Sequence, residues 1–405
     1  MSHYKPYPEY KESGIEWIGK VPEHWNLIPI KRLTKLNTVR MSDTTEGMTY
    51  IGLEDVESES GKYSPTDGNS RQSDSSTVGV FSKGQVLYGK LRPYLKKSII
   101  ADFDGVCSTE FLVLQPERVL PELLHRWFLT SDVTQQIEAT CEGAKMPRAD
   151  WESIGNISMP LPPKQEQLKI RESIQFETNR IDTLITKKTR FIELIKEKIL
   201  AIAMNEQMHG KDKFVRLGRL VQVISRPVKI VKEKEYIALG LYNRGRGLFH
   251  KPATLGKDIG DSNFFYVEED DLIISGQFAW EGAVTMASKS EEGCVVSHRY
   301  PILRGDTINT EYLYALLMTH FGDFLLNESS RGAAGRNRPL NINLLLNEKI
   351  RLPSTEAQMQ IKKLTNLKRV IDNKIYKSIK LLKERRSAFI TAAVTGQIDL
   401  REEVQ

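Results

Sequence analysis

The sequence predicts an α+β protein in which two similar mixed units are joined by two long antiparallel helices that form a coiled-coil spacer. Two observations carry this prediction. Almost four dozen residues without Pro or Gly follow Leu161-Pro-Pro163, and a comparable tract follows Leu352-Pro-Ser354. In addition, Leu161, Pro162, Gln167 and Ile170 recur 191 positions later in the chain. An internal repeat of this kind indicates duplicated architecture, so we expect a pseudo-twofold relation between the halves.

The repeat also sets the expected domain boundaries. A chain of 405 residues has room for two or three domains. Trp17 and Trp25 are expected to pin an irregular N-terminal arm against a core. The expected order is an arm at 1–25, a first mixed unit at 26–160, a first long helix with its exit at 161–213, a second mixed unit at 214–351 and a second long helix with its tail at 352–405.

The first mixed unit is expected to be mostly strands, because short apolar runs alternate there with Gly-rich and Ser/Asp-rich turns. Residues 27–36 suit either a short helix or a strand. The expected strands are 49–53, 85–91, 97–103, 109–114 and 154–159, with one helix at 121–138. The second mixed unit echoes this order, since Tyr236-Ile-Ala-Leu239 matches Tyr50-Ile-Gly-Leu53 and residues 311–326 parallel the helix. Asp270 and Asp271 are interpreted as turn residues rather than metal ligands.

Each long tract carries apolar residues at heptad spacing, which is typical of paired helices. One exposed apolar seam would leave either helix unstable alone in water, and pairing buries both seams. The residues expected to pair the helices are Ile174, Ile181, Leu184, Ile195 and Ile202 in the first tract and Ile361, Leu364, Ile371, Ile375, Leu382 and Phe389 in the second.

Charge is concentrated in one element. The net charge is +6, and residues 352–395 alone contain ten Lys/Arg against three acidic residues, a difference of +7. Such a stripe suits a polyanion or an acidic partner surface, although a solvated helix face explains it equally well. The three cysteines show no metal-ligand spacing. Without a signal peptide or a long apolar run, the expected location is cytoplasmic, with no membrane partner.

Several longer strings resemble the specificity subunit of type I restriction–modification systems. The strings are Gly14-Ile-Glu-Trp-Ile-Gly-Lys-Val-Pro-Glu-His-Trp25, Tyr88-Gly-Lys-Leu-Arg-Pro-Tyr94, Asp104-Gly-Val-Cys-Ser-Thr-Glu-Phe111, the two helix starts and Ala393-Val-Thr-Gly-Gln-Ile-Asp399. The resemblance covers nearly the whole chain. It implies two target-recognition domains on a helical spacer. The second unit departs from the pattern, because Ser275-Gly-Gln-Phe-Ala-Trp280 replaces the Gly-Lys-Leu-Arg-Pro-Tyr string.

The resemblance further implies a division of labour. Methylation and cleavage would belong to partner subunits, namely methyltransferase subunits, expected to number two, and restriction/translocase subunits. S-adenosylmethionine, ATP and Mg would bind those partners, so no cofactor or metal is expected on this chain. The residues agree, because the chain has no Asn/Asp-Pro-Pro-aromatic motif, no P-loop and no HExxH or GxSxG motif. No catalytic residue is therefore assigned.

Residues suited to double-stranded DNA gather in loops of both units. Basic side chains mixed with an aromatic one suit phosphate contacts with some base reading, and Arg and Gln can read G and A. An ordinary solvated surface is the alternative for each residue. The candidates are Lys90, Arg92, Tyr94, Lys96, Lys97, Lys145 and Arg148 in the first unit and Arg244, Arg246, Gln277, Trp280, Arg331, Arg336 and Arg338 in the second.

The sequence thus predicts a non-catalytic scaffold in which each unit reads one half of a bipartite asymmetric DNA target. The helices would fix the spacing and dock the methyltransferase subunits. Two other functions remain open at this stage. One is a self-sufficient DNA methyltransferase or nuclease, which the missing motifs disfavour. The other is a coiled-coil adaptor that does not bind DNA.

Overall fold

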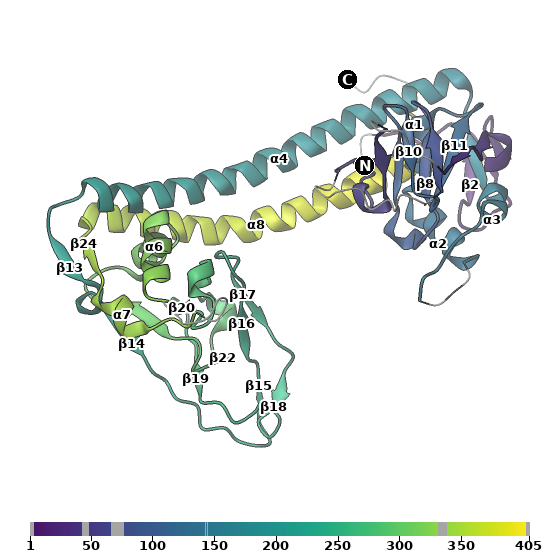
Figure 1. Ribbon diagram of the computed structural model, residues 1–405. Coiled ribbons are helices and arrows are strands. Elements are labelled where there is room, and N and C mark those ends of the chain that lie inside the picture. The colour runs from purple at the N-terminus through teal and green to yellow at the C-terminus, as the bar shows by residue number, and fades with distance from the viewer. Residues whose placement is uncertain are drawn as a thin grey trace. The chain divides into compact units, whose positions relative to one another are not determined.

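The computed structural model describes residues 4–42, 48–65, 77–141, 143, 145–330 and 338–401. Contacts divide the chain into two compact units. Unit 1 comprises Met1–Ile185 together with Ser378–Gln405, and unit 2 comprises Thr186–Lys377. Each unit therefore contains a mixed α/β part and one half of each long helix (Figure 1). Among the described helices, none is long and apolar enough to cross a membrane.

The N-terminal arm of unit 1 is a hairpin rather than an irregular segment, because β1 (Tyr10–Glu12) pairs antiparallel with β2 (Lys20–Pro22). Two tryptophans anchor it as expected. The Trp17 ring lies 5.4 Å from the Trp127 ring. Trp25 is fully buried and donates a hydrogen bond of 3.1 Å from Nε1 to the Glu166 carboxylate. A buried indole N–H needs such an acceptor, so Glu166 ties the arm to the first long helix.

Unit 1 is built around an antiparallel sheet with strand order β4-β11-β8-β9. Its strands are β4 (Thr34–Asn37), β11 (Phe111–Pro116), β8 (Val86–Gly89) and β9 (Ser98–Ile100). A second sheet has the order β5-β7-β10-β6, with strands β5 (Arg40–Met41), β7 (Val78–Phe81), β10 (Gly105–Cys107) and β6 (Tyr50–Ile51). Separately, β3 (Asn26–Pro29) pairs with β12 (Ser158–Leu161).

Two further expectations for unit 1 were wrong. The helix expected at 121–138 is two helices, α1 (Pro121–Phe128) and α2 (Ser131–Ala139). Thr130 separates them, because its hydroxyl donates to the Trp127 carbonyl at 2.8 Å and competes with the helical bonds. The strand expected at 154–159 begins only at Ser158. Before it lies α3 (Trp151–Asn156), which starts where the Asp150 side chain accepts a 2.7 Å bond from the Ser153 N–H.

Unit 2 repeats this order. Its antiparallel sheet β14-β23-β20-β21 and its β13-β24 pair match two sheets of unit 1. The strands are β14 (Val221–Ile224), β23 (Ile302–Gly305), β20 (Leu272–Ile274), β21 (Val284–Met286), β13 (Phe214–Arg216) and β24 (Lys349–Arg351). The helices are α5 (Thr310–Leu317), α6 (His320–Glu328) and α7 (Ile342–Asn347). Three two-stranded pairs complete it: β15 (Glu235–Tyr236) with β18 (Thr254–Leu255), β16 (Leu239–Leu241) with β17 (Leu248–His250), and β19 (Phe264–Tyr266) with β22 (Val295–Ser297).

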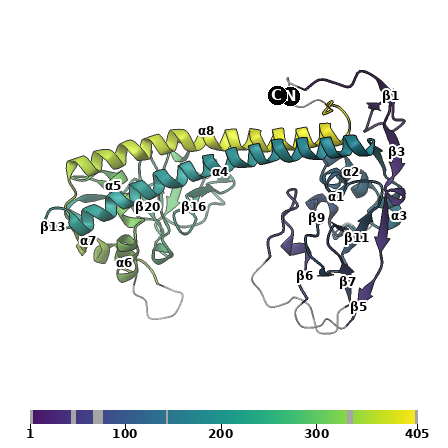
Figure 2. The same cartoon turned by 90° about the horizontal axis from the view of Figure 1, so that it is seen from above.

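The long helices are α4 (Lys164–His209) and α8 (Thr355–Val394), close to the predicted bounds. They run antiparallel within each unit (Figures 1 and 2). In unit 1, Arg386 near the end of α8 pairs with Asp182 at 3.5 Å. In unit 2, Ser354 just before α8 donates to Glu206 near the end of α4 at 3.0 Å.

Most residues predicted to pair the helices are covered. Six are buried, namely Ile174, Ile181, Ile195, Ile361, Ile375 and Phe389. Four are half-buried, namely Ile202, Leu364, Ile371 and Leu382. Leu184 is the exception, because it is 40% exposed. Its neighbour Ile185, four residues after Ile181, is half-buried instead, and Leu184 lies on the solvent side.

The repeated glutamine of the two helix starts has the same task in both units. In unit 1, Gln167 accepts a 2.9 Å bond from the Leu120 N–H at the start of α1 and donates to the Pro162 carbonyl at 3.0 Å. In unit 2, Gln358 accepts a 2.9 Å bond from the Asn309 N–H at the start of α5. Free N–H groups at a helix start need acceptors. The repeated residue therefore fastens each long helix to the mixed part of its unit.

Candidate nucleic-acid interface

In unit 1 the backbone brings the two predicted DNA-binding segments together. The Lys90 N–H bonds to the Glu110 carbonyl at 2.9 Å, and the Lys90 carbonyl accepts from Ala149 at 3.0 Å. The Arg92 N–H bonds to the Pro147 carbonyl at 2.8 Å. The turn after β8 and the loop at 145–148 thus form one surface.

The side chains on this surface differ in how free they are. Arg92, Tyr94, Lys145 and Arg148 are exposed, and Lys90 is half-buried. Arg148 forms an ion pair of 2.6 Å with Glu110, which holds its guanidinium over the turn. The amines of Lys96 and Lys97 instead form hydrogen bonds within the protein. Lys96 donates to the Ser131 hydroxyl at 2.9 Å, and Lys97 donates to the Leu53 carbonyl at 2.6 Å.

The turn after β8 carries backbone strain. Arg92 (φ 52°) and Lys96 (φ 48°) are both left-handed and flank the short 3₁₀ helix η3 (Pro93–Leu95). A non-glycine residue in this region costs on the order of 1–3 kcal/mol, and such residues gather at functional sites. The backbone bonds to Glu110 and Pro147 hold this conformation, so the turn is preorganised.

Unit 2 has an equivalent surface with different side chains. The Gly276 N–H bonds to the Arg299 carbonyl at 2.7 Å, and the Gly276 carbonyl accepts from Leu340 at 2.8 Å. These bonds parallel those at Lys90 of unit 1. The turn after β20 leads into η5 (Ala279–Glu281), and Gln277 on it is exposed. The Arg338 guanidinium lies 5.5 Å from the half-buried Trp280 ring, a cation–π contact that orients both side chains.

A further loop of unit 2 joins this surface. Arg244 (φ 57°) bonds through its N–H to the Glu281 carbonyl at 3.1 Å. Arg246 lies over the Tyr242 ring at 5.3 Å. Between the loops is a hollow of about 650 Å³, lined by Arg244, Trp280, Glu281, Gly282, Met318, Asp323 and Asn327. The predicted Arg331 and Arg336 lie outside the described residues.

Two exposed residues of unit 2 were missed by the sequence prediction. Arg299 occupies the position that Glu110 has in unit 1, because its carbonyl accepts from Gly276 as the Glu110 carbonyl accepts from Lys90. Phe278 is 42% exposed beside Gln277. It lies in the string that departs from the family pattern, which drew attention to Gln277 and Trp280 instead. Both residues extend the surface, one by a cation and one by an apolar ring.

The described residues contain no group of three or more His, Cys, Asp or Glu side chains that could hold a metal ion. Two buried titratable groups of unit 1 have strongly shifted pKa values. Burial raises the pKa of the Cys107 thiol to about 12 and lowers that of the His125 imidazole to about 3. The loops therefore present donors, cations and aromatic rings, which suit the recognition of a polyanion.

Comparisons with known proteins give a consistent relation. No family model matches the chain. The chain is 26% identical over 174 residues to the type I restriction enzyme EcoDI specificity subunit of Escherichia coli, a match covering 42% of this chain and 39% of that protein. It is 29% identical over 102 residues to the HindI specificity subunit of Haemophilus influenzae, covering 24% of this chain and 22% of that protein. The matches thus span less than half of these relatives.

A solved structure extends the likeness to the whole fold. It comes from work on complex assembly and conformational transition of the type I R-M system. It shares 20% identity with this chain, covers 93% of it and 99% of its own length, and has a TM-score of 0.63. At this identity the match concerns the fold. Over part of its length the chain is therefore similar in sequence to type I restriction enzyme specificity subunits, and its fold, with the repeated units and paired helices, is similar to that of the solved structure.

Proposed function

We propose that the chain is a non-catalytic DNA-recognition subunit in which each unit reads one half of a bipartite target. The observation that carries the proposal is the repeated surface. In both units the turn after the central strand is bonded to the same two neighbouring segments, and the exposed side chains on it are cationic, amide or aromatic. Cations position the phosphates, and Arg and Gln can read base edges.

The two half-sites should differ, because the two surfaces do. Where unit 1 presents Arg92 and the Arg148–Glu110 pair, unit 2 presents Gln277 and Arg299 on an equivalent backbone. Arg favours G, whereas Gln favours A. A target read by these two surfaces is therefore asymmetric.

The paired helices offer a second surface, suited to partner helices. On α4 the exposed Leu184 and Phe191 are seven residues apart, with Leu194 one turn further on. On α8 the exposed Leu367 and Leu381 are fourteen residues apart. Exposed apolar residues at heptad spacing mark a protein interface. This supports docking of two methyltransferase subunits, with restriction/translocase subunits joining through them in the cytoplasm. S-adenosylmethionine, ATP and Mg would bind those partners.

The spacing between half-sites tests the proposal. The chain is expressed in cells with its partners, and methylated adenines are mapped across the genome. Deleting residues 186–192 and 374–380 shortens each helix by about 10 Å while keeping the heptad phase. The gap in the methylated sequence should shrink by about three base pairs. Substituting Lys187 and Lys188 by Gln keeps the helix length and should leave the gap unchanged. An unchanged gap in the deletion variant would contradict the ruler function.

Two biochemical measurements separate the alternatives. The purified chain incubated with duplex DNA, S-adenosylmethionine and Mg²⁺ should produce no methylation and no cleavage; any product would restore the self-sufficient enzyme. In a shift assay across a salt series, binding of target duplex should weaken steeply as salt rises, because phosphate contacts release counterions. Absence of binding at low salt, both for the chain and for its complex, would instead indicate an adaptor.

A further inference from the structure

Both units expose a large aromatic ring in the equivalent turn, the one after the central strand. Tyr94 lies in η3 between β8 and β9 and is 46% exposed. Phe278 lies at the start of η5 between β20 and β21 and is 42% exposed. Counted from the equivalent residues Lys90 and Gly276, Tyr94 lies four residues further on and Phe278 two, so the shared feature is an exposed ring in the same turn rather than at the same position.

The turns that carry these rings are held firmly. In unit 1 the strained residues Arg92 and Lys96 enclose Tyr94, and Lys96 is bonded through Nζ to Ser131 on α2. In unit 2 the Asn327 side chain on α6 donates to the Trp280 carbonyl two residues after Phe278, at 3.4 Å. A ring on a rigid turn loses little conformational entropy on binding. Both rings are therefore positioned in advance of any partner.

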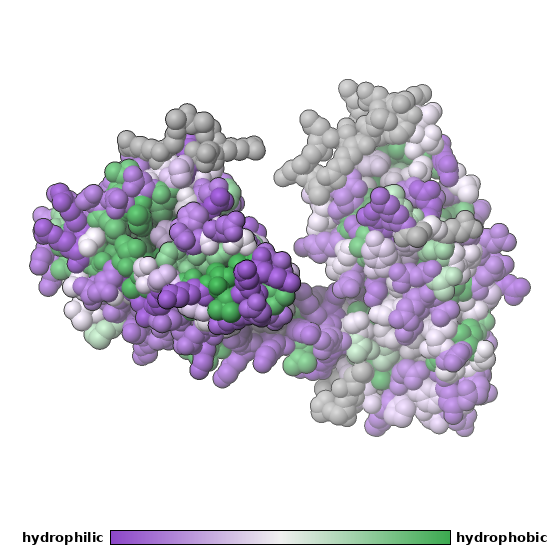
Figure 3. Space-filling view, turned by 90° about the horizontal axis from the view of Figure 1, so that it is seen from below, coloured by the Kyte–Doolittle hydropathy of each residue, from purple (hydrophilic) through white to green (hydrophobic). Residues whose placement is uncertain are grey.

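Exposed basic side chains lie near both rings, and their charge indicates which kind of partner the rings contact. Arg92 and Arg148 are exposed near Tyr94, and Gly276, two residues before Phe278, is bonded to the backbone of the exposed Arg299. Cations beside the rings would fall on phosphates. An apolar ring between phosphate contacts would face the sugars and the base pairs, and the base pairs offer it the larger apolar surface. Figure 3 shows one face of the molecule, on which hydrophobic residues lie exposed among hydrophilic ones.

We propose that Tyr94 and Phe278 are wedges that enter the duplex between two adjacent base pairs, one ring in each half-site. Apolar side chains used in this way partly unstack a base step and kink the duplex. The inference rests on the proposed DNA-recognition function and deepens it. Unstacking at each half-site would also lower the cost of extruding a nearby base, which an enzyme acting on that base must meet.

The test uses the full chain with its co-purified methyltransferase subunits and duplexes containing the methylated target. 2-Aminopurine replaces one base at a time across both half-sites, and its fluorescence rises where stacking is lost. The wild-type complex should give one bright step in each half-site in addition to the target base, which brightens when the methyltransferase extrudes it. Tyr94→Ala should abolish the bright step in one half-site only and weaken binding roughly tenfold, and Phe278→Ala should do the same in the other. Tyr94→Phe should retain its step.

A matched control is Phe214→Ala, which removes an aromatic ring of unit 2 that is 54% exposed on β13, outside the recognition loops. It should leave both bright steps in place. Bound duplex without a bright step in wild type, or bright steps that persist in both alanine variants, would overturn the wedge. Loss of the methyltransferase subunits from Tyr94→Ala or Phe278→Ala would also overturn it, by assigning the rings to protein docking. Failure of wild type to bind the duplex would instead contradict DNA recognition itself.

Discussion

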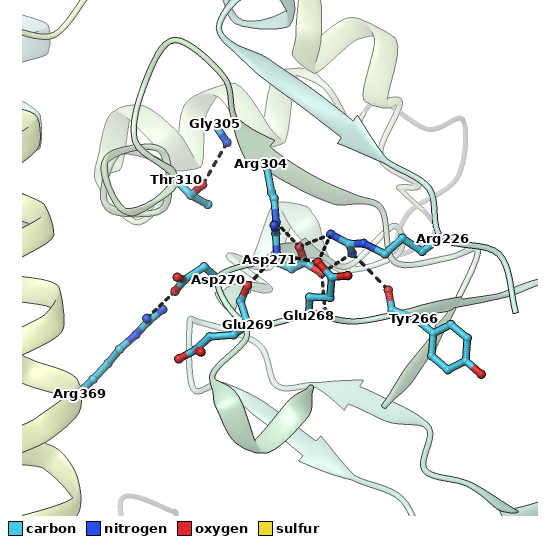
Figure 4. A network of polar contacts seen from close by, with 10 residues as sticks. All are labelled: Arg226, Tyr266, Glu268, Glu269, Asp270, Asp271, Arg304, Gly305, Thr310 and Arg369. Atoms are coloured by element: carbon cyan, nitrogen blue, oxygen red, sulfur yellow. Dashed lines mark hydrogen bonds and ion pairs between the residues drawn. The ribbon is translucent and has the colours of Figure 1, made fainter. Parts of the chain in front are cut away.

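In each unit a buried polar side chain lies just before the central strand of the main sheet, at a position that we call the buried corner. This side chain is neutral in unit 1 and charged in unit 2. In unit 1 the buried Gln85, just before β8, accepts a 2.8 Å bond from the Ser82 N–H and donates to the Gln115 side chain at 3.1 Å. In unit 2 the fully buried Asp271, just before β20, accepts a 2.8 Å bond from the Glu268 N–H. Its strand neighbour is Arg304, which donates at 2.6 Å (Figure 4).

The difference shows that the two units share the positions of these side-chain hydrogen bonds but not the residue types that form them. Gln85 in unit 1 and Asp271 in unit 2 both accept a hydrogen bond within the turn that precedes the central strand, and both bond to a side chain on the neighbouring strand. Unit 2 adds a second cation, because Arg226 also contacts Asp271, at 2.8 Å. Glu268 reaches both cations, at 2.9 Å to Arg226 and 3.3 Å to Arg304. A buried carboxylate with two guanidiniums is a demanding arrangement, since every charge depends on the others.

The largest expected effect follows from this contrast. Asp271→Asn leaves Arg226 and Arg304 without their buried anion and should destabilise unit 2 by about 3–5 kcal/mol. Gln85→Ala removes only neutral hydrogen bonds and should destabilise unit 1 by about 1–3 kcal/mol. Hydrogen exchange on peptides from each unit measures the two effects separately. Equal losses in the two units would show that the charge adds nothing to the shared geometry.

Sequence patterns predicted the duplicated architecture because long uninterrupted tracts and repeated motifs are local signals. Periodicity predicted which apolar residues of the long helices are covered, except at Leu184, where it does not distinguish between adjacent apolar residues. The role of Asp271 as a buried ion-pair partner could not be predicted from the sequence. Asp270-Asp271 looks like a polar turn, and only the fold brings Arg226 and Arg304 to the second carboxylate.

The recognition surface shows a similar limit. Basic residues in Gly-rich loops identified segments that the structure places together in each unit. Arg92 is exposed, whereas the Lys97 amine is hydrogen-bonded to the Leu53 carbonyl. The sequence does not distinguish these two cases, because the acceptor comes from a residue distant in the chain. Phe278 was not predicted, although its neighbours Gln277 and Trp280 in the same string were. Its exposure is a property of the folded turn.

The next expected effect concerns acid. His125 on α1 is buried against the Ser98 hydroxyl, and burial, with Arg126 and Arg386 adding repulsion, lowers its pKa to about 3. Below about pH 6.5 the imidazole takes up a proton in the unfolded chain but stays neutral in the folded unit. The stability that the neutral imidazole contributes is therefore fully present above about pH 6.5 and is lost as the pH falls from there towards the folded-state pKa. Between pH 7 and pH 4.5 this one group should cost unit 1 about 2–3 kcal/mol.

The equivalent position on α5 of unit 2 is Tyr314, whose pKa is raised by burial. A tyrosine contributes nothing to acid sensitivity in this range, so unit 2 provides the comparison. His125→Gln keeps a polar side chain and should flatten the acid dependence of unit 1. Hydrogen exchange followed from pH 7 to pH 4.5 checks this. An unchanged slope in the variant would assign the acid sensitivity to other groups.

The paired glutamines give a smaller contrast. Gln167 makes three hydrogen bonds, to Leu120, Pro162 and Arg118, the last at 3.3 Å. Gln358 makes two, and its bond to Pro353 is 3.4 Å long. Truncation to Ala leaves a helix-start N–H without its acceptor in both units. We expect a loss of about 2 kcal/mol for Gln167→Ala and about 1 kcal/mol for Gln358→Ala. A larger loss at Gln358 would reverse this order and show that bond number is a poor guide here.

The smallest expected effect lies next to the buried corner, where Asp270 (φ 69°) occupies the position of Gly84 (φ 86°). Asp270 accepts a 2.6 Å ion pair from Arg369 on α8, which compensates for its left-handed backbone. Asp270→Gly relieves about 1 kcal/mol of strain and loses a half-exposed ion pair of similar strength. The free energy of unfolding should therefore change by less than about 1 kcal/mol.

The reciprocal substitution sharpens the argument. Gly84→Asp introduces the same strain in unit 1, where a new Cβ meets no atom within 4 Å and therefore gains no packing. It should destabilise unit 1 by about 1–2 kcal/mol, as measured by hydrogen exchange of β8. A larger loss for Asp270→Gly than for Gly84→Asp would mean that the bond to α8 matters more than the strain it offsets. Unit 2 would then depend on its long helix in a way that unit 1, at this corner, does not.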